Sequence, residues 1–97
     1  MMEGEPIKFR MLELFNENSY WLQDIVPILQ EEYNLGGDYG RGMISYDIVE
    51  LVSAGFLKED ETIIDEDGKF WAGHLLTRYS ITPLGKDMYQ EIVNRIS

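Results

Sequence analysis

The chain has 97 residues, a net charge of −10 and no cysteine. This length predicts one domain, residues 1–97, and the lack of cysteine excludes disulfides and thiolate metal sites. Eighteen acids against eight bases argue against broad nucleic-acid affinity, because phosphate binding depends on clustered Lys and Arg. The charge favours solubility or a basic partner.

The first residues, MMEGEPIKF, lack the basic segment and long apolar run of a secretory signal. No apolar stretch approaches the ~18 residues that a membrane span needs. We therefore expect a cytoplasmic protein with no membrane partner.

Two amphipathic helices are predicted in the first third of the chain. The first covers about residues 6–17, with Pro6 suited to its first turn. Its apolar residues recur at helical spacing: Ile7, Met11, Leu14 and Phe15. The second helix carries a similar stripe: Leu22, Ile25, Val26, Leu29 and Tyr33. It should end near Tyr33, with Ser19 as a plausible N-cap. Because Pro27 clashes with a regular helix, this helix either begins late, near Asp24, or is kinked.

The next segment, NLGGDYGRG, holds four glycines in nine residues and predicts a loop. A third helix is expected over residues 41–54. Its inner face carries four apolar residues: Ile44, Ile48, Leu51 and Val52. Gly55 follows as a glycine able to adopt positive φ just beyond the helix end.

After Gly55 the apolar period changes to that of strands. FLKEDETIID predicts one strand, DEDG a tight turn at Asp67–Gly68, and LLTRYSIT a second strand. The segment KFWAGH either extends the second strand or belongs to a longer loop. Thr82 and Pro83 then begin a last helix, whose broad apolar face holds Leu84, Met88, Tyr89, Ile92 and Ile96. The order α-α-α-β-β-α predicts a mostly helical α+β fold: a winged helix with a three-helix core, a β-hairpin wing and a C-terminal helix.

Two stretches resemble winged helix-turn-helix transcription regulators. DIVELVSAGFLKED is similar to the end of their recognition helix, its glycine and the wing entry. YSITPLGKDMYQEI is similar to the wing exit and following helix of PadR-like, MarR-like and related archaeal regulators, where Tyr-x-Leu-Thr-x-x-Gly recurs. The matching residues here are Tyr79, Ile81, Thr82 and Gly85.

The resemblance implies a dimeric regulator that binds double-stranded DNA, with helix 41–54 in the major groove and the wing against the backbone or minor groove. Carried over to this sequence, it gives the DNA-contact candidates Arg41, Ser45, Tyr46, Ser53, Lys58, Lys69 and Arg78. The hairpin opposes this function, because its six acids would be repelled by phosphate: Glu59, Asp60, Glu61, Asp65, Glu66 and Asp67. The alternative is a winged-helix protein-interaction module that does not bind DNA and uses the acidic wing or the apolar terminal helices.

The terminal helices carry more apolar surface than one core contact needs. The candidates for a homodimer interface are Phe9, Leu12, Tyr89, Val93 and Ile96. The other interpretation is that the two helices pack on each other within one chain.

The sequence contains no pattern that predicts an enzyme, a cofactor or a metal. When Gly68 is aligned with the turn glycine of a calcium loop, Ile63 and His74 occupy ligand positions, so the match fails. His74 is the only histidine, and the glycine-rich segment lacks the Lys-Ser/Thr ending of a phosphate loop. We expect His74 on the wing surface and Trp71 packed beneath the wing.

Overall fold

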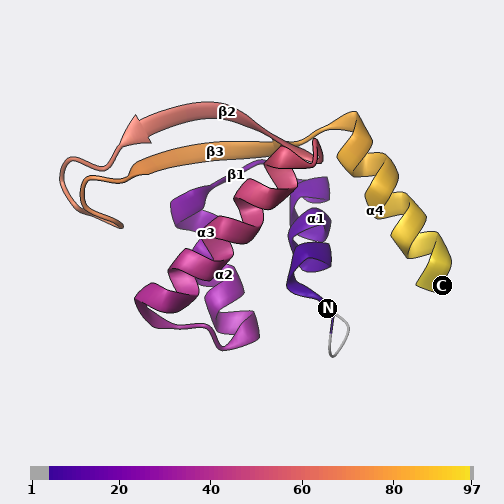
Figure 1. Ribbon diagram of the computed structural model, residues 1–97, viewed down its shortest axis with the longest axis horizontal. Helices are drawn as coiled ribbons and strands as arrows, with labels where there is room; N and C mark the ends of the chain where they lie inside the picture. Colours follow the sequence, from indigo (N-terminus) through magenta and orange to yellow (C-terminus); the bar gives the residue numbers. More distant parts are fainter. Residues whose placement is uncertain (1–4, 97) are drawn as a thin grey trace.

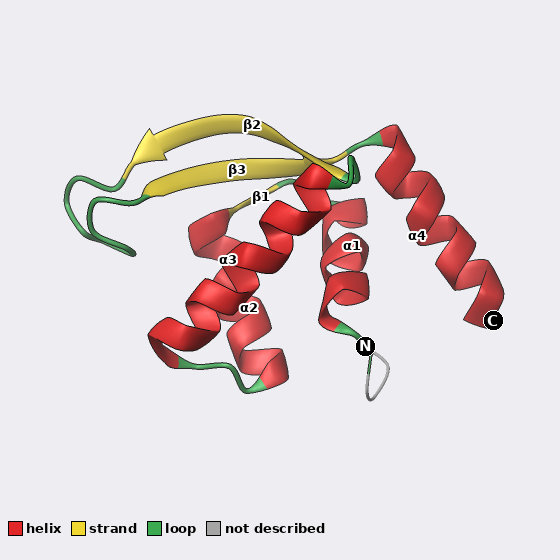
Figure 2. Cartoon of the chain, viewed as in Figure 1, coloured by secondary structure: helices red, strands yellow, loops and turns green. Residues whose placement is uncertain are grey.

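The structure is a computed structural model that describes residues 5–96. In this range the fold is α+β, with four helices and one three-stranded antiparallel sheet (Figures 1 and 2). In chain order the elements are α1 (Ile7–Glu17), β1 (Tyr20–Trp21), α2 (Leu22–Tyr33), α3 (Gly37–Ser53), β2 (Leu57–Ile64), β3 (Leu75–Ile81) and α4 (Pro83–Ile96).

The core lies where α1, α2 and α3 meet the base of the sheet. The buried cluster draws on all three helices and on β2 and β3: Met11, Leu12, Leu14, Phe15, Leu22, Ile25, Val26, Leu29, Ile44, Ile48, Leu51, Leu57, Leu76 and Tyr79. The tip of the β2–β3 hairpin and helix α4 lie at opposite ends of the molecule (Figure 1). Both ends therefore project beyond the core that the first three helices form.

Helix α1 agrees with its prediction apart from one residue, because Pro6 is the N-cap and the helix begins at Ile7. Phe9 and Leu12, the two candidates for a homodimer interface on this helix, are buried as well. Helix α4 covers Phe9, since the rings of Phe9 and Tyr89 lie 5.6 Å apart, whereas Leu12 belongs to the core cluster. Two apolar faces of α1 are thus covered instead of one.

The segment between α1 and α2 was predicted wrongly. Ser19 does not cap a helix, because Tyr20 and Trp21 form β1, which pairs with β3 through Tyr79 and Arg78. Helix α2 begins at Leu22, so the late start near Asp24 is also wrong. Pro27 lies inside this helix, where tertiary packing of the apolar stripe outweighs the lost backbone bond.

Helix α3 begins at Gly37, so most of the glycine-rich segment is helical and the predicted loop is wrong from that residue on. Gly40 explains part of this composition. A Cβ built on Gly40 would lie 1.7 Å from the carbonyl oxygen of Leu35, so only glycine allows the chain between α2 and α3 to turn this closely. The low helical propensity of glycine therefore gave the wrong prediction, because Gly40 is required by the close approach of the Leu35 carbonyl and not by a loop.

The end of α3 and the start of α4 confirm the sequence prediction. Gly55 has φ +85°, and the amides of Gly55 and Phe56 donate to the carbonyls of Val52 and Leu51, as in a Schellman motif. The Thr82 hydroxyl accepts from the Gly85 amide at 3.0 Å and donates to the Gly55 carbonyl at 2.6 Å. This pair of bonds caps α4 and ties it to the entry of β2.

The hairpin has both predicted strands, and the predicted turn at DEDG is present, because the Gly68 amide donates to the Asp65 carbonyl at 3.4 Å and Gly68 has φ +68°. β2 is an outer strand of the order β1-β3-β2, and a bulge lies between Glu59 and Glu61. The turn at residues 65–68 does not join the strands by itself, because residues 65–74 form a ten-residue loop between β2 and β3. KFWAGH belongs to this loop. Among residues 5–96, no helix is long and apolar enough to cross a membrane.

Candidate functional site

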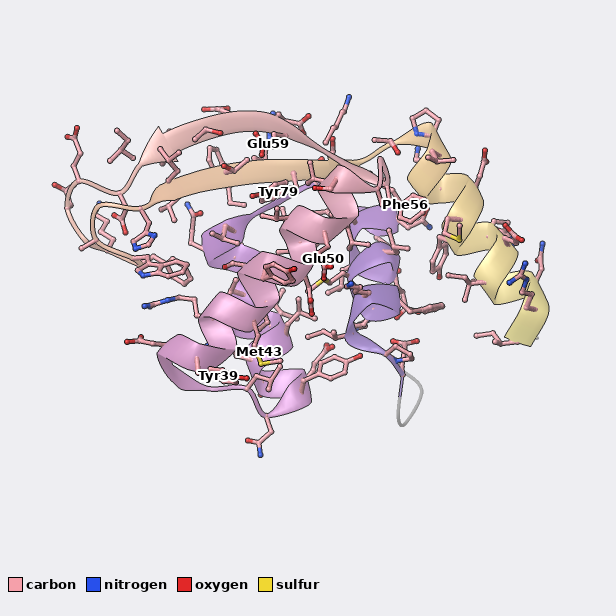
Figure 3. The ribbon with its side chains drawn as sticks, in the orientation of Figure 1. Tyr39, Met43, Glu50, Phe56, Glu59 and Tyr79 are labelled. Carbon is pink, nitrogen blue, oxygen red and sulfur yellow. The ribbon has the colours of Figure 1, made fainter. Side chains whose placement is uncertain are left out.

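The outward face of α3 carries large apolar and aromatic side chains. Tyr39, Met43, Tyr46 and Val49 are 80 %, 39 %, 64 % and 50 % exposed. Tyr39, Met43 and Glu50 lie along the helix in Figure 3. The opposite face of the same helix is buried through Ile44, Ile48 and Leu51. We call Tyr39, Met43, Tyr46 and Val49 the outer α3 stripe. The core covers only one face of α3, so the apolar side chains on the opposite face remain exposed.

Arg41, the single base of α3, is bound to the hairpin loop. Its guanidinium carbon lies 4.4 Å from the Trp71 ring centroid and 5.6 Å from that of Phe70. Its Nη1 donates to the Phe70 carbonyl at 3.3 Å, and its Nη2 donates to Asp38 at 2.9 Å. These contacts leave only 20 % of the Arg41 side chain exposed. The guanidinium therefore binds groups of its own chain.

Asp65 organises the loop that holds Trp71. Its carboxylate accepts three backbone N–H groups, from Lys69 at 3.0 Å, Phe70 at 2.8 Å and Trp71 at 2.6 Å. These hydrogen bonds, chiefly those from Trp71 and Phe70, hold the pKa of Asp65 below its ordinary value. One of the six acids of the hairpin is therefore buried and structural, which sequence reasoning did not anticipate. The His74 ring stacks on Trp71 at 4.0 Å and is exposed, as predicted for a wing-surface histidine.

The remaining DNA-contact candidates do not form one basic surface. The Ser45 hydroxyl donates to the Arg41 carbonyl at 2.8 Å, and Ser53 is exposed at the end of α3. Lys58 and Lys69 are exposed at opposite ends of the acidic run of the hairpin. Arg78 Nε lies 3.8 Å from Asp60, whose carboxylate also accepts from the Ser80 hydroxyl.

Ion pairs occupy most of the other bases. Arg10 binds Glu32 through two parallel bonds of 2.8 Å and also reaches Glu13 at 2.7 Å. Lys8 binds Glu50 at 2.8 Å. Within residues 5–96, five of the eight bases pair with carboxylates: Lys8, Arg10, Arg41, Arg78 and Arg95. Acids, in contrast, remain exposed along the hairpin and at the rim of the outer α3 stripe.

A second apolar feature is a groove of ≈ 460 Å³ between α1, the end of α3 and α4. Its apolar lining includes Phe9, Leu12, Leu51, Phe56, Met88, Ile92 and Ile96. Of the predicted dimer residues, Phe9 and Leu12 are buried, Tyr89 and Val93 are half-buried, and Ile96 is 53 % exposed. The first two are therefore packed chiefly within the chain, and the uncovered surface lies toward the end of α4.

Sequence reasoning missed Met43 and Asp47, which lie beside Tyr46 on α3. The i, i+4, i+7 spacing of Tyr39, Met43 and Tyr46 was the available signal. It was not used because the four glycines placed Tyr39 in a loop.

Among the described residues, no cluster of three or more His, Asp or Glu side chains could hold a metal ion. Comparisons with protein-family models, with curated proteins and with solved structures found no match to this chain.

Proposed function

We propose that the fold is a winged helix, in which α1, α2 and α3 form the core and the β2–β3 hairpin is the wing. The connections support this proposal. Only three residues, Asn34 to Gly36, separate α2 from α3, Gly55 leads α3 into β2, and Thr82 leads β3 into α4. A winged helix offers two surfaces to a macromolecule, namely the outward face of α3 and the wing.

We further propose that the chain is a protein-interaction module that docks a partner protein on the outer α3 stripe. The observation that carries this proposal is the composition of the stripe, where exposed Tyr39, Met43 and Tyr46 stand on the face that a DNA-reading helix would turn to the groove. Tyr and Met are enriched in the cores of protein interfaces. Exposed apolar side chains gathered on one helix face mark an interaction surface more often than isolated ones do.

Electrostatics support the same choice. A protein that binds duplex DNA neutralises several phosphates with Lys and Arg. Here Arg41 is held by Trp71 and Asp38, and Arg78 lies near Asp60. The bases left for phosphate near α3 and the wing are Lys58 and Lys69, which flank the acidic run of the hairpin.

A DNA-binding transcription regulator is the second candidate function. The arrangement of α2, α3 and the hairpin favours it, because these elements follow one another as in a helix-turn-helix with a wing. In this proposal α3 enters the major groove, and Tyr46, Ser53, Lys58 and Lys69 contact the duplex.

A titration of labelled genomic DNA fragments at low salt separates the two functions. The interaction module predicts no saturable binding at micromolar protein. Saturable binding that weakens steeply with added salt, and that is lost in a Lys58→Ala/Lys69→Ala variant, would establish the DNA function instead.

Site-specific cross-linking tests the docking surface directly. A photoreactive residue in place of Tyr46 should form a discrete cross-linked species in cells, and a Tyr39→Ala/Met43→Ala background should remove it. The matched control is the same photoreactive residue in place of Gln90, which is exposed on α4. Equal cross-linking from positions 46 and 90 would contradict docking on α3.

We also propose that the groove between α1 and α4 is covered by a second copy of the chain. The α4 stripe of Leu84, Met88, Ile92 and Ile96 supports this, since Leu84 and Ile96 are more than half exposed. A two-fold interface would place this stripe of each copy in the groove of the other.

A further inference from the structure

A glycine lies at the centre of the outer α3 stripe. Gly42 is part of a shallow depression of ≈ 510 Å³. The other lining residues are the stripe residues Tyr39, Met43 and Tyr46, and the acids Asp38 and Asp47. On a helix, Tyr39 at i−3 and Tyr46 at i+4 are the surface neighbours of Gly42. The missing side chain at Gly42 therefore leaves a notch between two tyrosines.

The fold does not require this glycine. A Cβ on Gly42 would meet no atom within 4 Å, and its φ is not in the left-handed region. Gly40, two residues earlier, is the opposite case, because its Cβ would collide with the Leu35 carbonyl. Glycine inside a helix costs roughly 0.5–1 kcal/mol relative to alanine. At position 42 the fold gains no close backbone approach in return, and Gly42 is one of the residues that line the depression.

The charge around the notch is negative. Asp47 is half-buried, and burial raises its pKa, while the nearest base, Lys8, is bound to Glu50 at 2.8 Å. Asp38 bonds Arg41 at 2.9 Å, yet its side chain remains 92 % exposed. A partner that covers this rim without its own cations would leave Asp47 desolvated and unpaired, which is unfavourable.

We propose that the Gly42 notch receives one apolar side chain of a partner protein segment, flanked by Lys or Arg residues that pair with Asp47 and Asp38. The inference rests on the interaction function proposed above and assigns the partner chemistry for that surface. Tyr39 and Tyr46 form the walls, and the flexible thioether of Met43 adapts to the inserted side chain. A methyl group at position 42 would occupy the floor of the notch.

Selection of a displayed library of random peptides on the wild-type chain tests this inference. The enriched peptides should carry a Leu, Met, Ile or Phe with Lys or Arg nearby. Gly42→Ala should weaken their binding about tenfold or more, as expected for loss of a central interface pocket. Asp47→Asn should weaken binding and reduce its salt dependence.

Two controls make the result specific. Gly36→Ala adds the same methyl group just before α3, where a Cβ also meets nothing within 4 Å, and should leave binding unchanged. Thermal unfolding of Gly42→Ala should show equal or higher stability, so that weaker binding is not a loss of folding.

The inference is overturned if no peptide is enriched, if the enriched peptides lack basic residues, or if Gly42→Ala binds them as tightly as the wild type. The outcomes also separate it from the proposed function. Cross-linking from position 46 that persists in Gly42→Ala would keep docking on α3 and exclude the notch. Absence of cross-linking together with saturable DNA binding would exclude the interaction function itself.

Discussion

The guanidinium of Arg41 stacks over the ring of Trp71, and this contact joins the beginning of α3 to the loop between β2 and β3. The two residues are distant in sequence, since Arg41 lies on a core helix and Trp71 lies in the loop of the hairpin that projects beyond the core. A cation over a tryptophan face is worth roughly 0.5–2 kcal/mol, depending on how far it is desolvated. The base expected to read DNA is thereby part of the framework that positions the hairpin.

Arg41→Ala should lower the free energy of unfolding by about 1 kcal/mol, because it removes the contacts with Trp71 and Phe70. Urea denaturation followed by circular dichroism measures this change. The control is a double-mutant cycle with Trp71→Ala. Additive effects of the two substitutions would show that they do not interact in solution.

The pH dependence of the hairpin loop should follow Asp65. Because its folded-state pKa lies below the unfolded value, Asp65 stabilises the loop above the ordinary carboxyl pKa. This contribution is lost as the pH falls through the folded-state pKa. Amide exchange at Phe70 and Trp71 should therefore accelerate in acid. Asp65→Asn should show the faster exchange already at neutral pH, since an amide NH₂ cannot accept the bonds that both carboxylate oxygens now make. Unchanged protection in Asp65→Asn would refute this role.

Two glycines of α3 should respond in opposite directions to alanine. Gly40→Ala should destabilise by about 1–3 kcal/mol, because the new methyl group must displace the Leu35 carbonyl. Gly42→Ala should stabilise by roughly 0.5–1 kcal/mol, because its methyl group meets open space. Thermal unfolding of the two variants under identical conditions gives the comparison. Equal shifts of the same sign would contradict the close approach at Gly40.

The pair between Arg10 and Glu32 should depend on the shape of the guanidinium. Arg10→Lys keeps the charge but loses the two parallel bonds, so unfolding should become easier by about 1–2 kcal/mol. Arg10 holds the pKa of Glu32 below its ordinary value, and the stabilisation should disappear as the pH falls through that lowered pKa. Chemical denaturation of both proteins at neutral and acid pH tests this. A deficit of Arg10→Lys that persists in acid would indicate a packing effect instead.

Self-association should require the apolar end of α4. Ile96→Glu places a charge at an exposed position of the groove and should shift the protein to monomer in analytical ultracentrifugation. Gln90→Glu adds the same charge on an exposed position of α4 outside the groove lining and serves as the control. A wild-type protein that sediments as a monomer would contradict the second-copy proposal.

The elements that sequence reasoning predicted well are those whose ends depend on local chemistry. Gly55 and Thr82 mark helix ends through bonds to residues within a few positions, and α1 and α4 keep an apolar period throughout. Local rules suffice for such features because the interactions that produce them are themselves local.

The features that sequence reasoning missed depend on contacts between distant segments. β1 has only two residues and exists because Tyr20 and Trp21 meet β3. The early start of α3 depends on the Leu35 carbonyl beside Gly40, and the loop depends on the three amides that Asp65 gathers. The contact between Arg41 and Trp71 could not be predicted for the same reason, since Trp71 lies in the hairpin loop and Arg41 on α3. Composition indicated an excess of acids over bases, but it did not show where the bases are bound.

The Thr82 cap has a consequence for how α4 could meet another molecule. Its hydroxyl bonds the Gly55 carbonyl at 2.6 Å, its amide bonds the Phe56 carbonyl at 3.0 Å, and Gly85 packs where a Cβ would lie 2.1 Å from that same carbonyl. These contacts at the first turn of α4 set the direction of the helix, in addition to any apolar packing farther along it. A chain entering the groove would thus meet a helix whose orientational freedom was already lost during folding, which lowers the entropic penalty of association. A hydroxyl outside the groove would in this way contribute to affinity within it.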